Sequence, residues 1–408
     1  MNSNPGGTVI DRAVTVAVGL LVVAGPAAAQ QVELAGQVRP RFEVRDPVEG
    51  LGTVEFTSMR TRAALAASLD RSVSVFVQLQ DVRIFGEESG TLTDYSADGL
   101  DLHQGWVELG DAEADRWSLR VGRQEAAYGG ERLVGAVGWT QQGRSFDGLR
   151  VRFRPSDDVV VDGLAFRLGN SFATGISEDE SLYGIYSTLA AAGSLDLYGL
   201  LHTRVATFTD LSRVTVGGRW VSESDAATWR LEGAYQGGDS DGPVLSRNIS
   251  AFMIGARVST QLSDDLTATL WYDHLSGDDD PTDDEIRAFD TLFATNHKFY
   301  GYMDLFLNIP AQTAGRGLQD LAVKASWDLG EGRSLGADLH TFHLAAADGL
   351  ETGRLGEELD LTYRWGYASG VGLTAGLSYF VAADAWSTVL GNPDEDQVWG
   401  YAMVDVTF

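Results

Sequence analysis

Apolar and charged residues alternate along this chain with a period of two, beginning close to its N-terminus. In the stretch 32–45 the apolar residues fall at even positions and the charged residues at odd positions: Val32, Leu34, Val38, Phe42 and Val44 against Glu33, Arg39, Arg41, Glu43 and Arg45. Side chains of a β-strand point alternately to its two faces, so this stretch predicts a strand with one apolar and one charged face. Its length suits a tilted strand that crosses a bilayer, which needs about 10 residues.

The same alternation recurs along the chain, at residues 59–69, 73–80, 149–154, 320–327, 358–365, 371–381 and 398–408. Short polar links, such as residues 155–157, separate some stretches, and longer acidic links, such as residues 276–285, separate others. Short turns at one end and long loops at the other are typical of an outer-membrane barrel. We therefore predict an all-β fold, a transmembrane antiparallel β-barrel of about 18 strands. After residue 30 no run of 18 apolar residues offers a membrane helix instead.

The first 30 residues have the features of a targeting segment. Arg12 precedes an apolar run at residues 13–25, and residues 27–29, all Ala, offer a small-residue cleavage site. We predict a signal peptide at residues 1–29 and a single barrel domain at 30–408, with a short N-terminal membrane helix as the alternative. Trp and Tyr near the strand ends suit aromatic girdles, and the last stretch closes on Phe408. These features predict the Gram-negative outer membrane, with its lipid as a partner, over a soluble β-protein.

The charged face of these strands must line the lumen, because an Arg that faces lipid near the midplane costs roughly 2–4 kcal/mol. Nearly all the basic residues are Arg, and only Lys298 and Lys324 are Lys. The interior Arg residues predicted by the alternation lie in the N-terminal third: Arg39, Arg41, Arg60, Arg62, Arg120, Arg150, Arg152 and Arg154. A ladder of Arg forks could pass a polyanion from site to site. The alternative is structural Arg–Glu pairing with Glu33, Glu43, Glu108 and Glu125.

The net charge of −28 comes mostly from residues 155–408, which hold 14 basic and 38 acidic residues. Acidic runs fall in turn-like stretches, at residues 177–180, 278–280, 283–285 and 394–396. Solvated loops explain them most simply, and they also favour a general or cation-preferring diffusion porin as the alternative function. No cofactor or metal is predicted, although calcium at the acidic run 278–285 stays open. Nucleic acid is disfavoured as a partner, since no basic stripe is present.

Sequence motifs for catalysis are absent. The chain has no Gly-x-Ser-x-Gly, P-loop or paired metal motif, and no Cys. His340 and His343 are three residues apart on a predicted strand, so they point to opposite faces and do not suit a shared metal. We predict that the protein is not an enzyme. A barrel-borne hydrolase and a surface adhesin are the alternatives from other classes.

Two groups of motifs resemble the alginate-export family of outer-membrane β-barrels. The first group is Val121-Gly122-Arg123-Gln124-Glu125, Tyr128-Gly129-Gly130-Glu131-Arg132 and Gly143-Arg144-Ser145-Phe146-Asp147-Gly148. The second group is Leu275-Ser276-Gly277-Asp278-Asp279, Phe289-Asp290-Thr291-Leu292-Phe293 and Thr295-Asn296-His297-Lys298-Phe299-Tyr300-Gly301. The combination is specific, whereas any five-residue piece is not, and the resemblance covers residues 31–408.

The resemblance implies an 18-stranded monomeric barrel whose Arg-lined constriction passes an anionic polysaccharide such as alginate outward. The motifs make Arg123 and Arg144 the first candidates for that lining, with Arg150 and Arg152 beside them. Alternation adds Arg60 and Arg62 to the substrate pathway.

The resemblance also implies that Asn296, His297 and Lys298 lie in or near a folded loop that shapes the pore mouth, with simple loop packing as the alternative. The chain is short for a dedicated alginate secretion porin, so we expect less room for plug loops. Its acidic loops would repel a polyuronate at the entrance unless cations screen them.

Overall fold

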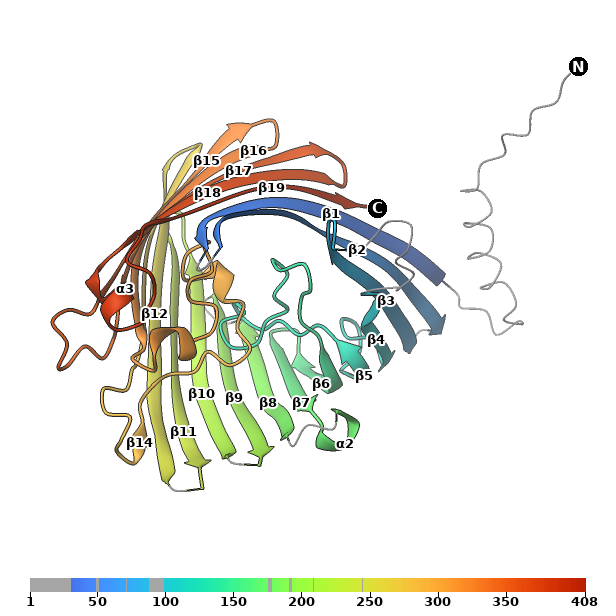
Figure 1. Cartoon of the computed structure of the whole chain (residues 1–408). Helices are drawn as coiled ribbons and strands as arrows, with labels where there is room; N and C mark the ends of the chain where they lie inside the picture. Colours follow the sequence, from blue (N-terminus) through green and yellow to red (C-terminus); the bar gives the residue numbers. More distant parts are fainter. Residues whose placement is uncertain are drawn as a thin grey trace, which may run out of the picture.

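The structure is a computed structural model that describes residues 31–48, 51–70, 72–87, 99–174, 178–190, 193–207, 209–243 and 245–408. The predicted signal peptide, residues 1–29, lies outside these ranges. Within them, 18 long strands form one closed antiparallel barrel (Figure 1). The prediction of an all-β barrel with about 18 strands is confirmed.

The first half of the barrel contains β1 (Gln31–Val48), β2 (Gly52–Asp70), β3 (Val73–Ile84), β4 (Asp101–Leu109), β5 (Trp117–Gln124), β6 (Phe146–Ser156), β7 (Val159–Gly169), β8 (Glu178–Ala190) and β9 (Ser194–Ala206). The second half contains β10 (Asp210–Glu223), β11 (Thr228–Asp241), β12 (Ser246–Ser263), β13 (Leu266–Leu275), β15 (Leu318–Gly330), β16 (Arg333–His343), β17 (Arg354–Ala368), β18 (Val371–Ala382) and β19 (Gln397–Thr407). The two-residue strand β14 (Glu285–Ile286) pairs in parallel with β12.

The barrel closes through β1, which pairs with β2 on one edge and with β19 on the other. Arg41, for example, lies opposite Ser58 of β2 and Met403 of β19. Closure matters because hydrocarbon offers no hydrogen-bonding partner to an open sheet edge.

The two faces of the wall follow the alternation in the sequence. On β1, Leu34 and Phe42 face outward and are 69% and 43% exposed, whereas Arg39 and Glu43 face inward and are 5% and 2% exposed. Apolar side chains thus cover the lipid-facing surface, and charged side chains cover the lumen.

Short turns lie at the end of the barrel that holds the start of β1 and the end of β19. Residues 157–158 and 331–332 form two of these turns. The longer connections, such as residues 344–353 and 383–396, lie at the opposite end. In outer-membrane barrels the short-turn end is periplasmic and the long-loop end is extracellular.

Two of the extracellular connections turn back into the barrel (Figure 1). We name residues 125–145 inner segment 1 and residues 276–317 inner segment 2. Their apolar side chains, such as Val134, Phe299 and Phe306, pack against inward residues of the wall, such as Trp271 and Phe342. Both segments fit inside the barrel although the chain is short, and the expectation of less room for plug loops than in a dedicated alginate secretion porin stays a prediction.

Helical structure in the described ranges is limited to α2 (Ser171–Thr174), α3 (Asp384–Thr388) and two single 3-10 turns, Asn296–Lys298 and Ala311–Thr313. None of these helices has the length and apolar character that would let it span a membrane.

Candidate functional site

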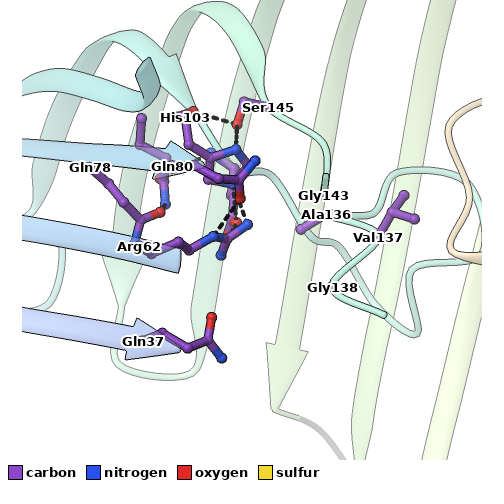
Figure 2. A network of polar contacts seen from close by, with 12 residues as sticks. Gln37, Arg62, Gln78, Gln80, His103, Ala136, Val137, Gly138, Gly143 and Ser145 are labelled. Atoms are coloured by element: carbon purple, nitrogen blue, oxygen red, sulfur yellow. Dashed lines mark hydrogen bonds and ion pairs between the residues drawn. The ribbon is translucent and has the colours of Figure 1, made fainter. Parts of the chain in front are cut away.

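Polar side chains of β2 and β4 hold the stem of inner segment 1. Nε2 of His103 lies 2.7 Å from Oε1 of Glu125, the first residue of the segment. The Ser145 hydroxyl, on the last residue of the segment, donates to the backbone carbonyl of His103 at 2.6 Å. Nη1 of Arg62 lies 3.3 Å from the same Glu125 oxygen. Figure 2 shows Arg62 of β2 and His103 of β4, two strands that flank β3, extending toward this stem. One histidine thus contacts both ends of the segment.

These residues have the composition of a hydrolase triad, but their geometry does not suit one. Ser145 Oγ lies 3.3 Å from Nδ1 of His103, yet the hydroxyl donates its proton to the backbone carbonyl. Nη2 of Arg62 lies 2.8 Å from Nε2 of His103, the nitrogen that faces Glu125. A general base must accept the proton of its nucleophile. The cluster therefore has a structural role in holding the segment.

Three Arg side chains of β1 and β2 hold the tip of inner segment 1 through its backbone carbonyl groups. Arg39 donates to the carbonyl oxygens of residues 138, 139 and 140 at 2.8, 3.0 and 2.8 Å. Arg60 reaches those of residues 138 and 140 at 3.4 and 3.2 Å, and Arg41 donates to that of residue 139 at 2.9 Å. Carbonyl oxygens do not neutralise a guanidinium group, so Arg39 and Arg60, which form no ion pair among the described residues, remain net cations.

The two inner segments pair with each other across the lumen. Val134 and Phe293 form a parallel β-bridge, and the backbone N–H of Gly135 donates to the Phe293 carbonyl at 2.8 Å. Arg144 donates to the carbonyls of Phe293 and Ala294. Burial lowers the pKa of Arg144, while its carbonyl acceptors favour the charged form. Each segment is thus held by the other in addition to its own contacts with the wall.

Arg132 connects both inner segments to the wall at one buried point. Nη1 of Arg132 lies 2.7 Å from Oδ2 of Asp273 on β13 and donates to the Tyr300 hydroxyl at 2.9 Å. Nε lies 3.3 Å from Oε2 of Glu232 on β11, and the guanidinium carbon lies 4.1 Å from the centroid of the Phe299 ring. The Arg132 side chain is only 2% exposed, so these partners replace its hydration.

Carboxylates of β17 hold inner segment 2 through its backbone amides. The N–H of Tyr302 donates to Asp360 at 3.2 Å, and the N–H of Met303 donates to Glu358 at 2.8 Å. Gly301 has a φ of 80°, and a Cβ at this position would lie 2.5 Å from the Glu358 carboxyl group. Only glycine meets both requirements.

A central cavity of about 500 Å³ remains between the inner segments and the wall. Its polar and aromatic lining comprises Arg39, Glu131, Trp139, Thr295, His297, Lys298, Tyr302, Arg364, Thr374 and Tyr401. Arg364 faces inward from β17, is exposed, and has no hydrogen bond or ion pair among the described residues. Lys298 pairs with Glu131. The two Arg residues of this lining therefore carry positive charge without a direct ion pair to a carboxylate in the described part of the chain.

Aromatic rings form one side of the central cavity. Trp139 stacks on His297, with ring centroids 4.2 Å apart and 5° between the planes. Tyr401 meets Trp139 edge-on at 5.0 Å, and the Arg41 guanidinium lies over Trp139 at 4.4 Å. The Trp139 ring is thus packed against His297 and Arg41, and Tyr401 is itself buried and stacked on Trp399, so these rings form a closely packed side of the cavity.

The structure corrects the predicted place of Arg123. On β5, Ser118 and Arg120 face inward, whereas Val121 and Arg123 face outward. Nη1 of Arg123 lies 2.8 Å from Oδ2 of Asp147 on the outer face of β6. The prediction that Arg123 lines the lumen is wrong, because a residue three positions from an inward one on a strand points to the other face.

The other predicted Arg residues face the lumen, but each has protein partners. Arg150 lies 3.2 Å from Glu108, and Arg152 lies 2.7 Å from Asp162, so both belong to ion pairs of the wall. Arg60 and Arg62 hold inner segment 1, and Arg144, a residue of that segment, joins it to inner segment 2.

The predicted loop residues lie on a 3-10 turn of inner segment 2, inside the barrel. Asn296 is buried and donates within its own segment. Nδ1 of His297 lies 2.6 Å from Oδ1 of Asp304. Lys298 reaches the central cavity, where it pairs with Glu131.

The sequence analysis did not select Arg364 as a site residue, although the alternation of apolar and polar residues indicates that it faces the lumen. The alternation at residues 358–365 sets Arg364 against Leu361 and Tyr363, which places it inward. Trp139 lies between two of the motifs of the first group, and nothing local indicates that it stacks on a residue of the other inner segment.

The acidic run 278–285 is partly neutralised by arginines. Asp278 lies 2.9 Å from Arg247, and Asp283 lies 2.7 Å from Arg287. The hydrogen bond from Arg287 is the main cause that lowers the pKa of Asp283. In the described part of the chain no group of three His, Cys, Asp or Glu residues could hold a metal ion. Calcium at this run stays an untested prediction.

A family model described as "Alginate export" matches residues 30–391. Among solved structures, OccAB4 of Acinetobacter baumannii is similar with a TM-score of 0.63 and 13% identity, over 94% of this chain and 100% of that chain. OccK3 (OpdO) of Pseudomonas aeruginosa is similar with a TM-score of 0.64 and 14% identity, over 93% and 96%. At these identities the likeness concerns the fold. No curated protein matches the chain.

Proposed function

Since the chain belongs to the alginate-export family and is an outer-membrane porin of Gram-negative bacteria, we propose that its central cavity passes anionic saccharides, with alginate as the leading candidate. The observation that carries this proposal is the positive charge of Arg39 and Arg364, which have no carboxylate partner among the described residues.

Two features of the lining support an anionic saccharide over a small cation. The electrostatic attraction between a carboxylate and an Arg 4 Å away amounts to about 1 kcal/mol in bulk water and about 4 kcal/mol at an effective dielectric constant of 20. Arg364 has no ion pair among the described residues, so it can form this interaction with a solute. Arg150 and Arg152 already form it with Glu108 and Asp162. Tyr302 and Thr374 of the same lining add hydroxyl groups that a simple anion would not need.

The acidic extracellular runs favour a second candidate, a general or cation-preferring diffusion porin. Residues 394–396 and 278–280 would attract cations to the pore entrance and repel a polyuronate at low salt. Within the leading proposal, the acidic entrance opposes uptake of polyanions, which agrees with transport outward. We further propose that the barrel acts as a monomer and that transport involves no catalysis.

Replacement of the unpaired lumen cation Arg364 by a carboxylate should change the ion selectivity of the channel. We expect the wild-type channel to prefer anions in a salt gradient, and Arg364→Glu to lower the anion-to-cation permeability ratio roughly tenfold, since about 1.4 kcal/mol corresponds to a factor of ten. The reversal potential of single channels in planar bilayers measures this ratio. Arg123→Glu is the matched control, because the same charge change on the outer face should leave the ratio unchanged.

A cation-preferring wild-type channel would contradict the proposal and support the second candidate. An equal effect of Arg364→Glu and Arg123→Glu would mean that the selectivity arises from the overall charge and not from the central cavity.

A further inference from the structure

A second, smaller cavity lies in the wall on the periplasmic side of the central cavity. It has a volume of about 200 Å³ and is bounded by β13, β15, β16 and β17. Tyr302 and Arg364 line both cavities. A ligand that leaves one cavity for the other therefore stays within reach of the same unpaired guanidinium.

The cavity exists because one inward position of the wall lacks a side chain. Cross-strand pairing aligns Thr267, Ser326, Gly336 and Thr362 in one row over four neighbouring strands. Gly336 stands between two hydroxyl-bearing residues and leaves a hollow in this row. The backbone conformation at this position does not require glycine, because its φ is not positive. An added Cβ would have room, since its nearest neighbour, Nη1 of Arg364, would be 3.8 Å away.

The hydroxyl groups beside this hollow are available to a ligand. Thr267 and Ser326 make no side-chain hydrogen bond among the described residues, and Ser326 is exposed to the lumen. Each hydroxyl can donate one hydrogen bond and accept others. A small inorganic anion or a plain carboxylate needs donors only, whereas a sugar ring presents hydroxyls that need both.

Charged groups and an aromatic ring complete the lining. The next row of the wall contains Lys324 and Asp338, whose Nζ and Oδ2 are 2.8 Å apart. The Tyr302 ring lies 5.8 Å from Nζ of Lys324 and forms the boundary with the central cavity. Arg364 can receive a carboxylate, while Asp338 can accept a hydrogen bond from a sugar hydroxyl.

We propose that the hollow at Gly336 is a saccharide subsite, which holds one uronate ring through the hydroxyls of Thr267 and Ser326 and its carboxylate through Arg364. The inference deepens the proposed function and rests on it. It explains how a pore could prefer a sugar acid to any other anion of equal charge. A chain in transit would dwell here before it enters the central cavity.

Removal of the hydroxyls without change of shape or charge tests the subsite. The double variant Thr267→Val and Ser326→Ala should bind an alginate trisaccharide about tenfold more weakly, since two neutral hydrogen bonds are lost. The measurement is block of single-channel current by the trisaccharide added from the periplasmic side. Block by tricarballylate, a tricarboxylate without hydroxyl groups, should stay unchanged, as should the reversal potential. Thr341→Val, on the outer face of β16, is the matched control.

A second variant fills the hollow. Gly336→Val should also reduce block by the trisaccharide at least tenfold, and its heat-modifiable migration on gels reports whether the barrel has folded. If both variants keep wild-type block in an anion-selective channel, the subsite is refuted and the anion pathway stands. If the wild-type channel prefers cations, the proposed function itself fails. Equal weakening of trisaccharide and tricarballylate block would also refute recognition of hydroxyl groups.

Discussion

Arg132→Met is expected to release both inner segments while the barrel wall stays folded. The substitution leaves Asp273 buried without its cation, whereas Glu232 keeps Arg230, and the loss of one partner from a buried pair typically costs about 3–5 kcal/mol. The same change removes the hydrogen bond to Tyr300. We expect channels that spend at least a hundredfold more time in a state of higher conductance, since each factor of ten corresponds to about 1.4 kcal/mol. Single-channel recording measures this occupancy directly.

The control for this prediction is Arg120→Met. Arg120 pairs with Glu108 in the wall and contacts neither inner segment, and Glu108 keeps Arg150 as a partner after the change. We expect its conductance to match that of the wild type. The double variant Arg132→Met and Asp273→Asn should recover part of the low-conductance state, because it removes the unpaired charge. Wild-type current traces for Arg132→Met would mean that the segments are held by their apolar contacts alone.

The faces of the wall could be predicted from the sequence because alternation is a local property of a strand. Arg60, Arg62, Arg150 and Arg152 all face the lumen, as the pattern of neighbouring residues indicates. Arg123 was assigned by its motif instead of its place in the alternation, and it lies on the outer face. Where the two arguments disagree, the alternation is the more reliable one, because a charge on the wrong face of a strand cannot rotate across the sheet.

The arrangement of the inner segments could not be predicted, because each contact that holds them joins distant parts of the chain. The carbonyl groups that Arg39 binds are about 100 residues away, and Gly301 lies against Glu358 of another strand. The sequence contains the donors and acceptors but no periodic pattern that pairs them.

The partners of each lumen Arg distinguish three roles that the sequence presents as one. Arg150 and Arg152 pair with carboxylates and support the wall. Arg39 and Arg60 bind carbonyl groups, so they fix a loop and still contribute positive charge. Arg364 binds no described residue and can interact with a solute. Selectivity and pore size therefore depend on different arginines, and variants can separate the two properties.

The double variant Arg39→Ala and Arg60→Ala is expected to widen the pore. It removes the hydrogen bonds from Arg39 and Arg60 to the carbonyl groups of residues 138–140, and hydrogen bonds that involve a charged group contribute roughly 1.5–3 kcal/mol each. Of the three arginines only Arg41 then still binds residues 138–140, while Gln141 and residue 142 keep their hydrogen bonds to the wall. We expect the tip to leave the wall and the conductance to double or more. The size of polyethylene glycol that enters the pore should rise in parallel. Arg120→Ala with Arg150→Ala removes the same number of lumen cations without touching the tip, so its exclusion size should stay near that of the wild type. If both double variants widen the pore equally, the effect comes from lost side-chain volume, and the carbonyl contacts of Arg39 and Arg60 do not determine the pore size.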